Sequence, residues 1–147
     1  MSKSIGIVTL RSPHGFDETL QLLLGSIEAR GMKVFLDLDQ QAEALGVGLE
    51  IPKAHLLLFG RPASGTQILL ECPEAGIDLP LKVFVWESEH GGTHVSYDSP
   101  YYIAERYPLS GAVRSLFGVV TLVAEVVVRS RPSPVTSSRA ELPSAPT

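Results

Sequence analysis

The sequence contains little of what marks secreted, zinc-rich or nucleic-acid-binding proteins. Its one cysteine, Cys72, cannot form a disulfide within the chain and excludes a cysteine-rich zinc module. Lysine and arginine number 12 against 16 aspartate and glutamate residues, so the net charge is −4 and no broad basic surface is available for phosphate backbones. We therefore expect no nucleic-acid partner, and a reducing compartment suits the single thiol.

Long hydrophobic runs are also missing. The longest, residues 116–128, has 13 residues and contains Glu125, whereas a bilayer core needs about 20 apolar residues. The first ten residues, MSKSIGIVTL, include only a short apolar stretch and no small-residue cleavage site of the kind found in secretory signals. These absences predict a cytoplasmic protein without a membrane partner.

The residues that are present suit one ordinary domain. The chain has 147 residues, of which 44% are hydrophobic, which is enough for a core without metals or disulfides. We place this domain at residues 1–129. The remaining segment, residues 130–147, consists largely of serine, proline and threonine with almost nothing to bury, and it predicts a disordered tail.

Hydrophobic periodicity predicts an α+β protein with the order β-α-β-β-(α)-β-β-α. The expected strands are β-branched or alternating segments, and they cover residues 4–10, 33–39, 54–59, 81–87 and 93–98. The expected helices cover residues 16–31, 63–71 and 112–128, with a further helical turn over residues 101–107. Gly15 is the expected N-cap of the first helix, whose first turn carries Asp17 and Glu18.

The sequence EHGGTH, residues 89–94, has two histidines around a diglycine. If Gly91 and Gly92 form a two-residue primed turn, Trp86 faces Tyr97 and Glu89 faces His94. One face of this hairpin would then be apolar and the other polar, with the polar face made of Glu87, Glu89, His94, Ser96 and Asp98. The two histidines would point to opposite faces, so we expect a turn and no metal site.

Two further expectations extend this polar face. Asp37 and Asp39 alternate with apolar residues in the second strand, and on the same face they would give an acidic surface for a cation or a basic ligand. An ordinary solvated sheet face, kept soluble by charge, is the preferred alternative. Phe35, Val83 and Val85 are expected on the same side, where a second subunit would cover them.

Other candidates for chemistry are isolated residues. Arg61 follows a strand and precedes a helix, where a guanidinium and backbone amides could hold a carboxylate or phosphate, although an ordinary surface arginine is the simpler interpretation. We expect Cys72 to be a packed thiol, and His14 and His55 to be capping, surface or hydrogen-bonded residues. The sequence offers no catalytic triad.

Four motifs occur in order along the chain. They are SPHGFDET at residues 12–19, FGRP at 59–62, LPLKV at 79–83 and YDSP at 97–100. With them, the sequence resembles the domain of unknown function 302 (DUF302) family over about residues 4–129. The resemblance implies a TBP-like fold, in which helices pack on one face of a curved antiparallel sheet of four to five strands, and often a homodimer. It implies no particular reaction, and such a fold does not by itself imply DNA binding.

The sequence therefore predicts a noncatalytic module that binds a small ligand or a partner, self-associates as a homodimer and uses no cofactor. Its candidate ligand-binding residues are Arg61, Glu89, His94 and Asp98. The enzyme alternative uses His94 as a general acid or base, oriented by Glu89 or Asp98, with Arg61 stabilising an anionic group. That alternative requires these residues around one cleft. A purely structural dimerisation domain would have no pocket.

Overall fold

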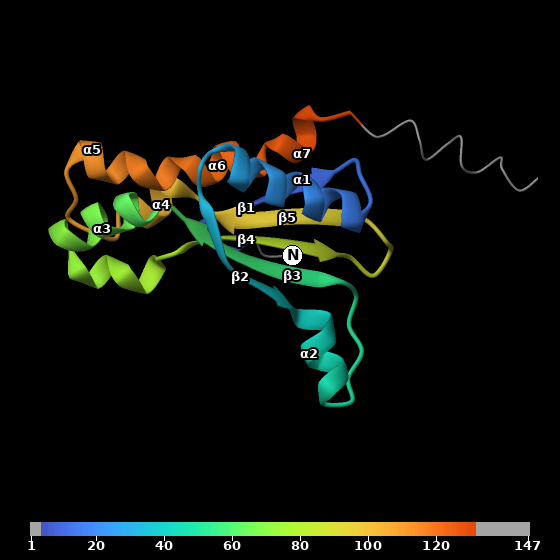
Figure 1. Ribbon diagram of the computed structural model, residues 1–147. Helices are drawn as coiled ribbons and strands as arrows, with labels where there is room; N and C mark the ends of the chain where they lie inside the picture. The colour runs from blue at the N-terminus through green and yellow to red at the C-terminus, as the bar shows by residue number, and fades with distance from the viewer. Residues whose placement is uncertain (1–3, 132–147) are drawn as a thin grey trace, which may run out of the picture.

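The computed structural model describes residues 4–131, which form a five-stranded antiparallel sheet with helices on one face and at one end (Figure 1). The strands are β1 (Ile7–Ser12), β2 (Lys33–Asp39), β3 (Ala54–Gly60), β4 (Leu81–Glu87) and β5 (Thr93–Asp98). Their order across the sheet is β1-β5-β4-β3-β2. The predicted α+β class and antiparallel sheet are confirmed, and the predicted tail lies almost wholly outside the described residues.

Helical elements connect several of the strands and continue beyond β5. They are α1 (Phe16–Ala29), α2 (Gln40–Gly46), α3 (Pro62–Glu71), the 3₁₀ helix η1 (Pro73–Asp78), α4 (Pro100–Ala104), α5 (Gly111–Arg114), the 3₁₀ helix η2 (Ser115–Gly118), α6 (Val119–Ala124) and α7 (Val126–Arg129). Sequence analysis missed α2 and η1. α2 has no buried residue and projects away from the sheet (Figure 1).

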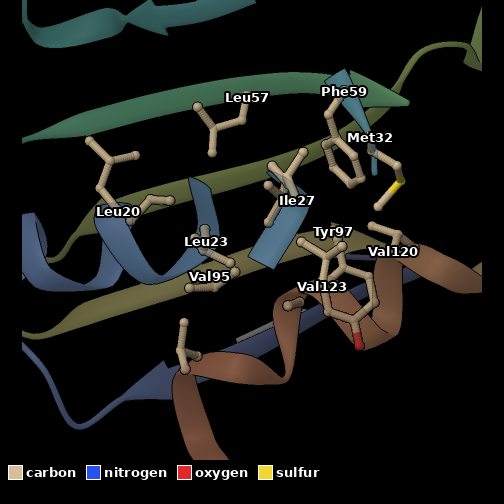
Figure 2. Close-up of a cluster of buried hydrophobic side chains, with 14 of the residues drawn as sticks. Leu20, Leu23, Ile27, Met32, Leu57, Phe59, Val95, Tyr97, Val120 and Val123 are labelled. Atoms are coloured by element: carbon tan, nitrogen blue, oxygen red, sulfur yellow. The ribbon is translucent and has the colours of Figure 1, made fainter. Parts of the chain in front are cut away.

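The main core lies between the sheet and α1. Gly15 is the N-cap of α1, as predicted, and the buried residues of the helix recur every three or four positions, which turns one face toward the sheet. Leu23 and Ile27 are fully buried, and they pack in one cluster with Leu57 of β3 and Val95 of β5 (Figure 2).

The helical run from Gly111 to Arg129 covers the rest of this face. It has 19 residues with a mean hydropathy of 1.8, so by length and composition it could cross a membrane. Val123, Ala124 and Val127 are nevertheless fully buried in the core with α1 and the sheet. The run thus contributes side chains to the core of a fold that is largely that of a soluble domain, while only 28% of its apolar window is buried, and the cytoplasmic location stays a prediction.

The hairpin between β4 and β5 differs from the predicted one. Ser88 and Gly92 close a three-residue loop, because the Ser88 N–H donates to the Gly92 carbonyl at 2.8 Å and the Gly91 N–H donates to the Ser88 carbonyl at 2.9 Å. Gly91 has a φ of +89°, the left-handed conformation that ends such a loop. The predicted two-residue turn is wrong, and Trp86 faces His94 rather than Tyr97.

This register reverses the predicted faces of β4. Val83 and Val85 are fully buried in the core beneath the helices. Phe84 and Trp86 lie on the opposite face, where Phe84 pairs with Ser96 of β5. The prediction that Val83 and Val85 are covered by a second subunit is therefore wrong.

A bulge changes the faces of β2. The register shifts between Val34 and Leu36, so Asp37 pairs with the buried Leu57 and lies on the helix side of the sheet. Asp39 lies on that side too, opposite His55. The predicted acidic surface is wrong, because these aspartates and the polar residues of β5 lie on opposite faces of the sheet.

Candidate functional site

The face of the sheet that α1 leaves uncovered is apolar across three strands. We call this the open sheet face, and its apolar members are Leu36 and Leu38 of β2, Leu56 and Leu58 of β3, and Phe84 and Trp86 of β4. Leu36 is exposed, and the other five side chains are only half-buried. A sheet face that packs on nothing is usually polar in antiparallel sheets, so this pattern indicates a contact surface.

The margin of the open sheet face on β5 and β1 is polar. The indole N–H of Trp86 donates to Ser96 Oγ at 2.9 Å, and that hydroxyl lies 2.8 Å from Thr9 Oγ1 of β1. The ring of His94 stacks on Trp86 with 4.5 Å between centroids. These contacts hold His94 against the indole at the edge of an apolar surface.

The predicted site residues do not surround one cleft. His94 pairs with Trp86, which pairs with Ala54 at the start of β3, whereas Arg61 follows the end of β3. Ala54 and Arg61 are seven residues apart, at about 3.3 Å per residue, so His94 and Arg61 lie near opposite ends of the sheet, about 23 Å apart along the strands. Asp98 lies four positions beyond His94 on β5, a distance of about 13 Å.

Glu89 lies in the three-residue loop, beyond the end of the β4–β5 ladder, rather than opposite His94. Neither Glu89 nor Asp98 therefore pairs with the imidazole of His94 as expected. The enzyme arrangement that brings Arg61, His94, Glu89 and Asp98 around one substrate is wrong, because antiparallel pairing spreads them along the sheet.

The structure brings together a different histidine and two carboxylates. His55 Nδ1 lies 2.6 Å from Asp37 Oδ1, and His55 Nε2 lies 3.5 Å from Asp39 Oδ2. Asp39 also caps α2 by accepting a bond from the Ala42 N–H at 2.9 Å. Residues 4–131 contain no group of three or more His, Cys, Asp or Glu side chains suited to a metal. The contacts of His55 link β3 to β2, and the cap on the Ala42 N–H links β2 to α2.

His14 is buried and structural. Its Nε2 lies 3.1 Å from the carbonyl of Val127, and its Nδ1 lies 3.3 Å from Glu18 Oε1. This places the imidazole between the start of α1 and the end of α7. Cys72 is buried in a hydrophobic cluster outside the main core, with Ile68 of α3 and Phe117 of η2, as expected of a packed thiol.

A cavity of about 310 Å³ lies between α3, η1 and the adjoining ends of β3 and β4, and we call it the α3 cavity. Its apolar lining includes Phe35, Phe59, Ile68, Leu69, Leu81 and Leu116. Arg61 is the single charged residue of the lining, and the hydroxyl-bearing residues are Ser64 and Thr66. Arg61 is thus the one predicted site residue that lines this cavity.

Arg61 is held in place without a carboxylate partner. Its Nη2 donates to the carbonyl of Arg30, which caps the C-terminal end of α1. Among residues 4–131, no Asp or Glu oxygen lies within 4.0 Å of the guanidinium. A guanidinium has five N–H donors, so most of them stay available to a ligand.

Asp78 belongs to η1, the 3₁₀ helix that contributes Gly76 to the lining of the α3 cavity. This carboxylate ends η1, accepts a bond from the hydroxyl of Tyr107, and pairs with Arg106 Nη1 at 3.0 Å. Burial, and then the hydrogen bond to Asp78, raise the pKa of Tyr107 to about 12.

The raised pKa of Tyr107 predicts a loss of stability in alkali. Between pH 10 and pH 12 the unfolded tyrosine releases its proton while the folded one keeps it, so the free energy of unfolding falls as pH rises. Tyr107→Phe removes this titration, and we expect a shallower decline by urea unfolding at pH 9, 10, 11 and 12. Tyr101→Phe, at a residue that is 84% exposed, is the control and should follow the unmodified protein. Equal declines in all three proteins would contradict the prediction.

The fold and sequence can be compared with known proteins. Residues 8–120 match the family described as "Domain of unknown function DUF302". The crystal structure of an uncharacterized conserved protein DUF302 from Bacillus stearothermophilus is similar with a TM-score of 0.72 and 20% identity, over 87% of this chain and 100% of that chain. At this identity the likeness concerns the fold.

Three curated relatives are each 33% identical over 104 residues, or 71% of this chain. They are fluoride-specific ion channel FluC 1 of Brucella suis, FluC 1 of Brucella abortus and FluC 2 of Brucella melitensis. The matched part is 41% of the first relative and 38% of the other two, so the chain spans about two fifths of their length. The family match covers most of the present sequence, and the chain belongs to the DUF302 family.

Proposed function

We propose that this chain is a noncatalytic binding module whose copies pair through the open sheet face. The observation that carries the proposal is the apolar surface across β2, β3 and β4, centred on Leu56 and Phe84. Removing this surface from water is favourable by about 25 cal/mol per Å², and a second copy offers the matching surface. Most homo-oligomers pair in this self-complementary way about a two-fold axis.

The open sheet face alone is smaller than the area that a stable interface buries on each partner. Strands about 4.8 Å apart and about 20 Å long give five strands a face of roughly 500 Å² in projection, whereas a stable interface buries about 800 Å² on each partner. The connection after β2 supplies further apolar surface, because Leu45, Val47 and Leu49 are exposed. We therefore include the projecting α2 segment in the interface.

Charge at the margin also suits a second copy. The sheet margin carries Arg11 on β1, Lys82 on β4 and Asp98 on β5. A two-fold axis can place a basic residue of one copy near an acidic residue of the other, which fixes the orientation of the pair. The apolar centre and mixed-charge rim have the composition of a protein interface.

Small-ligand binding forms the second part of the proposed function. The α3 cavity falls at the lower end of the 300–1,000 Å³ typical of ligand pockets, and its few polar groups could orient a bound molecule. This site lies beyond the end of β3 and does not depend on His94, Glu89 or Asp98.

The curated relatives support a role inside a larger assembly. Their names describe fluoride-specific ion channels, and a segment similar to this chain makes up about two fifths of each. A pairing module in such a chain would bring two channel chains together. We assign no passage of fluoride to the present segment, because the candidate membrane span found among residues 4–131 contributes buried side chains to the domain core.

Leu56→Glu tests the pairing. We expect light scattering to give the unmodified protein twice its 15.8 kDa chain mass, and to give the variant the mass of one chain. Leu56 pairs with Leu38 and Phe84, so a glutamate there is an unpaired buried charge in the interface, which weakens pairing by about 3–5 kcal/mol, or at least about a hundredfold.

Leu122→Glu is the matched control, since it makes the same change at a leucine of α6 that is 43% exposed. This variant should keep the mass of the pair, and circular dichroism should show that both variants are folded. An unmodified protein that stays monomeric at tens of micromolar, or a Leu56→Glu variant that still pairs, would reject the interface.

A further inference from the structure

We propose that the α3 cavity binds a small amphipathic carboxylic acid, with its apolar chain inside the cavity and its carboxylate on Arg61. This inference rests on the ligand-binding part of the proposed function and names the chemical class of the ligand. It does not depend on pairing through the open sheet face.

The lining of the cavity selects an apolar chain. Ile68 is 2% exposed and Phe59 is fully buried, so the inner wall belongs to the protein core and offers no polar partner. A polar group placed there would lose its hydrogen bonds to water without replacement. At about 310 Å³ the cavity is at the lower end of the range for ligand pockets, which suits a short chain of roughly eight carbons.

The charge of Arg61 selects an anionic head group. Arg61 is one of the residues that line the cavity, and its guanidinium has no carboxylate partner within the described part of the chain. The bond from its Nη2 to the Arg30 carbonyl restricts the side chain before a ligand arrives. A held guanidinium with free N–H groups fits the two oxygens of a carboxylate in a bidentate manner.

The start of α3 favours a carboxylate over a phosphate. Pro62 has no N–H, and the N–H groups of Ser64 and Gly65 already donate to the carbonyl of Arg61 at 2.9 and 3.1 Å. The helix therefore offers few free amides of the kind that phosphate sites use. One guanidinium, with the hydroxyl-bearing residues Ser64 and Thr66 in the same lining, suits a head group with a single negative charge.

Two probes of equal chain length test this assignment. Octanoate and octan-1-ol are titrated into the full chain by isothermal titration calorimetry at pH 7. We expect octanoate to bind at least about tenfold more tightly, because a hydrogen bond to a charged group contributes about 1.5–3 kcal/mol. Arg61→Gln should remove this preference by weakening octanoate about tenfold or more, and it should leave octan-1-ol unchanged.

A second variant tests the location. Gly65, Ile68 and Leu69 share one face of α3 and line the cavity, and a Cβ at Gly65 meets nothing within 4 Å. Gly65→Leu should therefore fold, fill the cavity and abolish the binding of both probes. Gly25→Leu makes the same change at an exposed glycine of α1, where a Cβ is also unobstructed, and should bind as the unmodified protein does.

The outcomes separate the inference from the proposed function. Equal affinities for octanoate and octan-1-ol, or an Arg61→Gln variant that still prefers octanoate, would overturn the carboxylate assignment. Loss of binding in Gly65→Leu would then still support a ligand in the α3 cavity. If the unmodified protein binds neither probe, both the inference and the ligand-binding part of the proposed function fail.

Discussion

Val85→Glu will unfold the domain, whereas the same replacement at the next residue, Trp86, will leave it folded. Val85 is fully buried between the sheet and α1, so its replacement places an unpaired charge in the core. The penalty is several kcal/mol, which is comparable to the 5–15 kcal/mol that stabilises a typical domain. Trp86 lies on the open sheet face, and Trp86→Glu gives up its stack on His94 and one bond to Ser96, about 1–3 kcal/mol.

The measurement is thermal unfolding followed by circular dichroism. We expect a cooperative transition for Trp86→Glu and none for Val85→Glu. The pair also tests the hairpin register, because the two-residue turn expected from Gly91 and Gly92 would put Trp86 in the core and Val85 outside. A folded Val85→Glu protein beside an unfolded Trp86→Glu protein would show that the three-residue loop is wrong.

The buried face and the loop length of the β4–β5 hairpin could not be predicted from the sequence pattern. The strand KVFVWE is apolar on both faces, because Val83 and Val85 face the helices while Phe84 and Trp86 face the opposite side. Alternation therefore could not reveal which set is buried. Two adjacent glycines are equally compatible with a two-residue and a three-residue loop, and only the register of the ladder distinguishes them.

Other elements were predictable because local signals agreed. The strands over residues 33–39, 81–87 and 93–98 have the expected bounds, and Gly15 begins α1 as its N-cap. α2 was missed because it buries no residue and so has no apolar stripe to detect. The bulge after Val34 was missed for a different reason, since nothing in an alternating strand marks an unpaired residue.

The candidate sites depend on contacts that are distant in sequence. Arg61 could be singled out beside a strand end, but the cavity that it lines also needs Phe35 and Leu116, which belong to other segments. The cluster of His55 with Asp37 and Asp39 arises from the pairing of β2 with β3, which the sequence does not state. Single residues can thus be chosen from sequence, while their grouping follows from strand order.

Gly6→Ala will destabilise the domain far more than Gly48→Ala. Both glycines have a left-handed φ, +74° and +79°, which costs an alanine about 1–2 kcal/mol. At Gly6 a Cβ would also lie 2.5 Å from the ring of Tyr102, whereas at Gly48 it meets nothing within 4 Å. Moving the ring adds about 1–3 kcal/mol, so we expect Gly6→Ala to lower the free energy of unfolding by about 2–5 kcal/mol.

The contact matters because Gly6 joins two segments that lie far apart in sequence. Its carbonyl accepts a bond from the Ser99 N–H at 2.7 Å. Gly6 directly precedes β1, and Ser99 directly precedes α4, the helix that carries Tyr102. A double-mutant cycle with Tyr102→Ala separates the two causes, with urea unfolding as the measurement. With the ring removed, Gly6→Ala should cost no more than Gly48→Ala does. If the larger penalty persists without the ring, it comes from the backbone at Gly6 and not from the approach of α4.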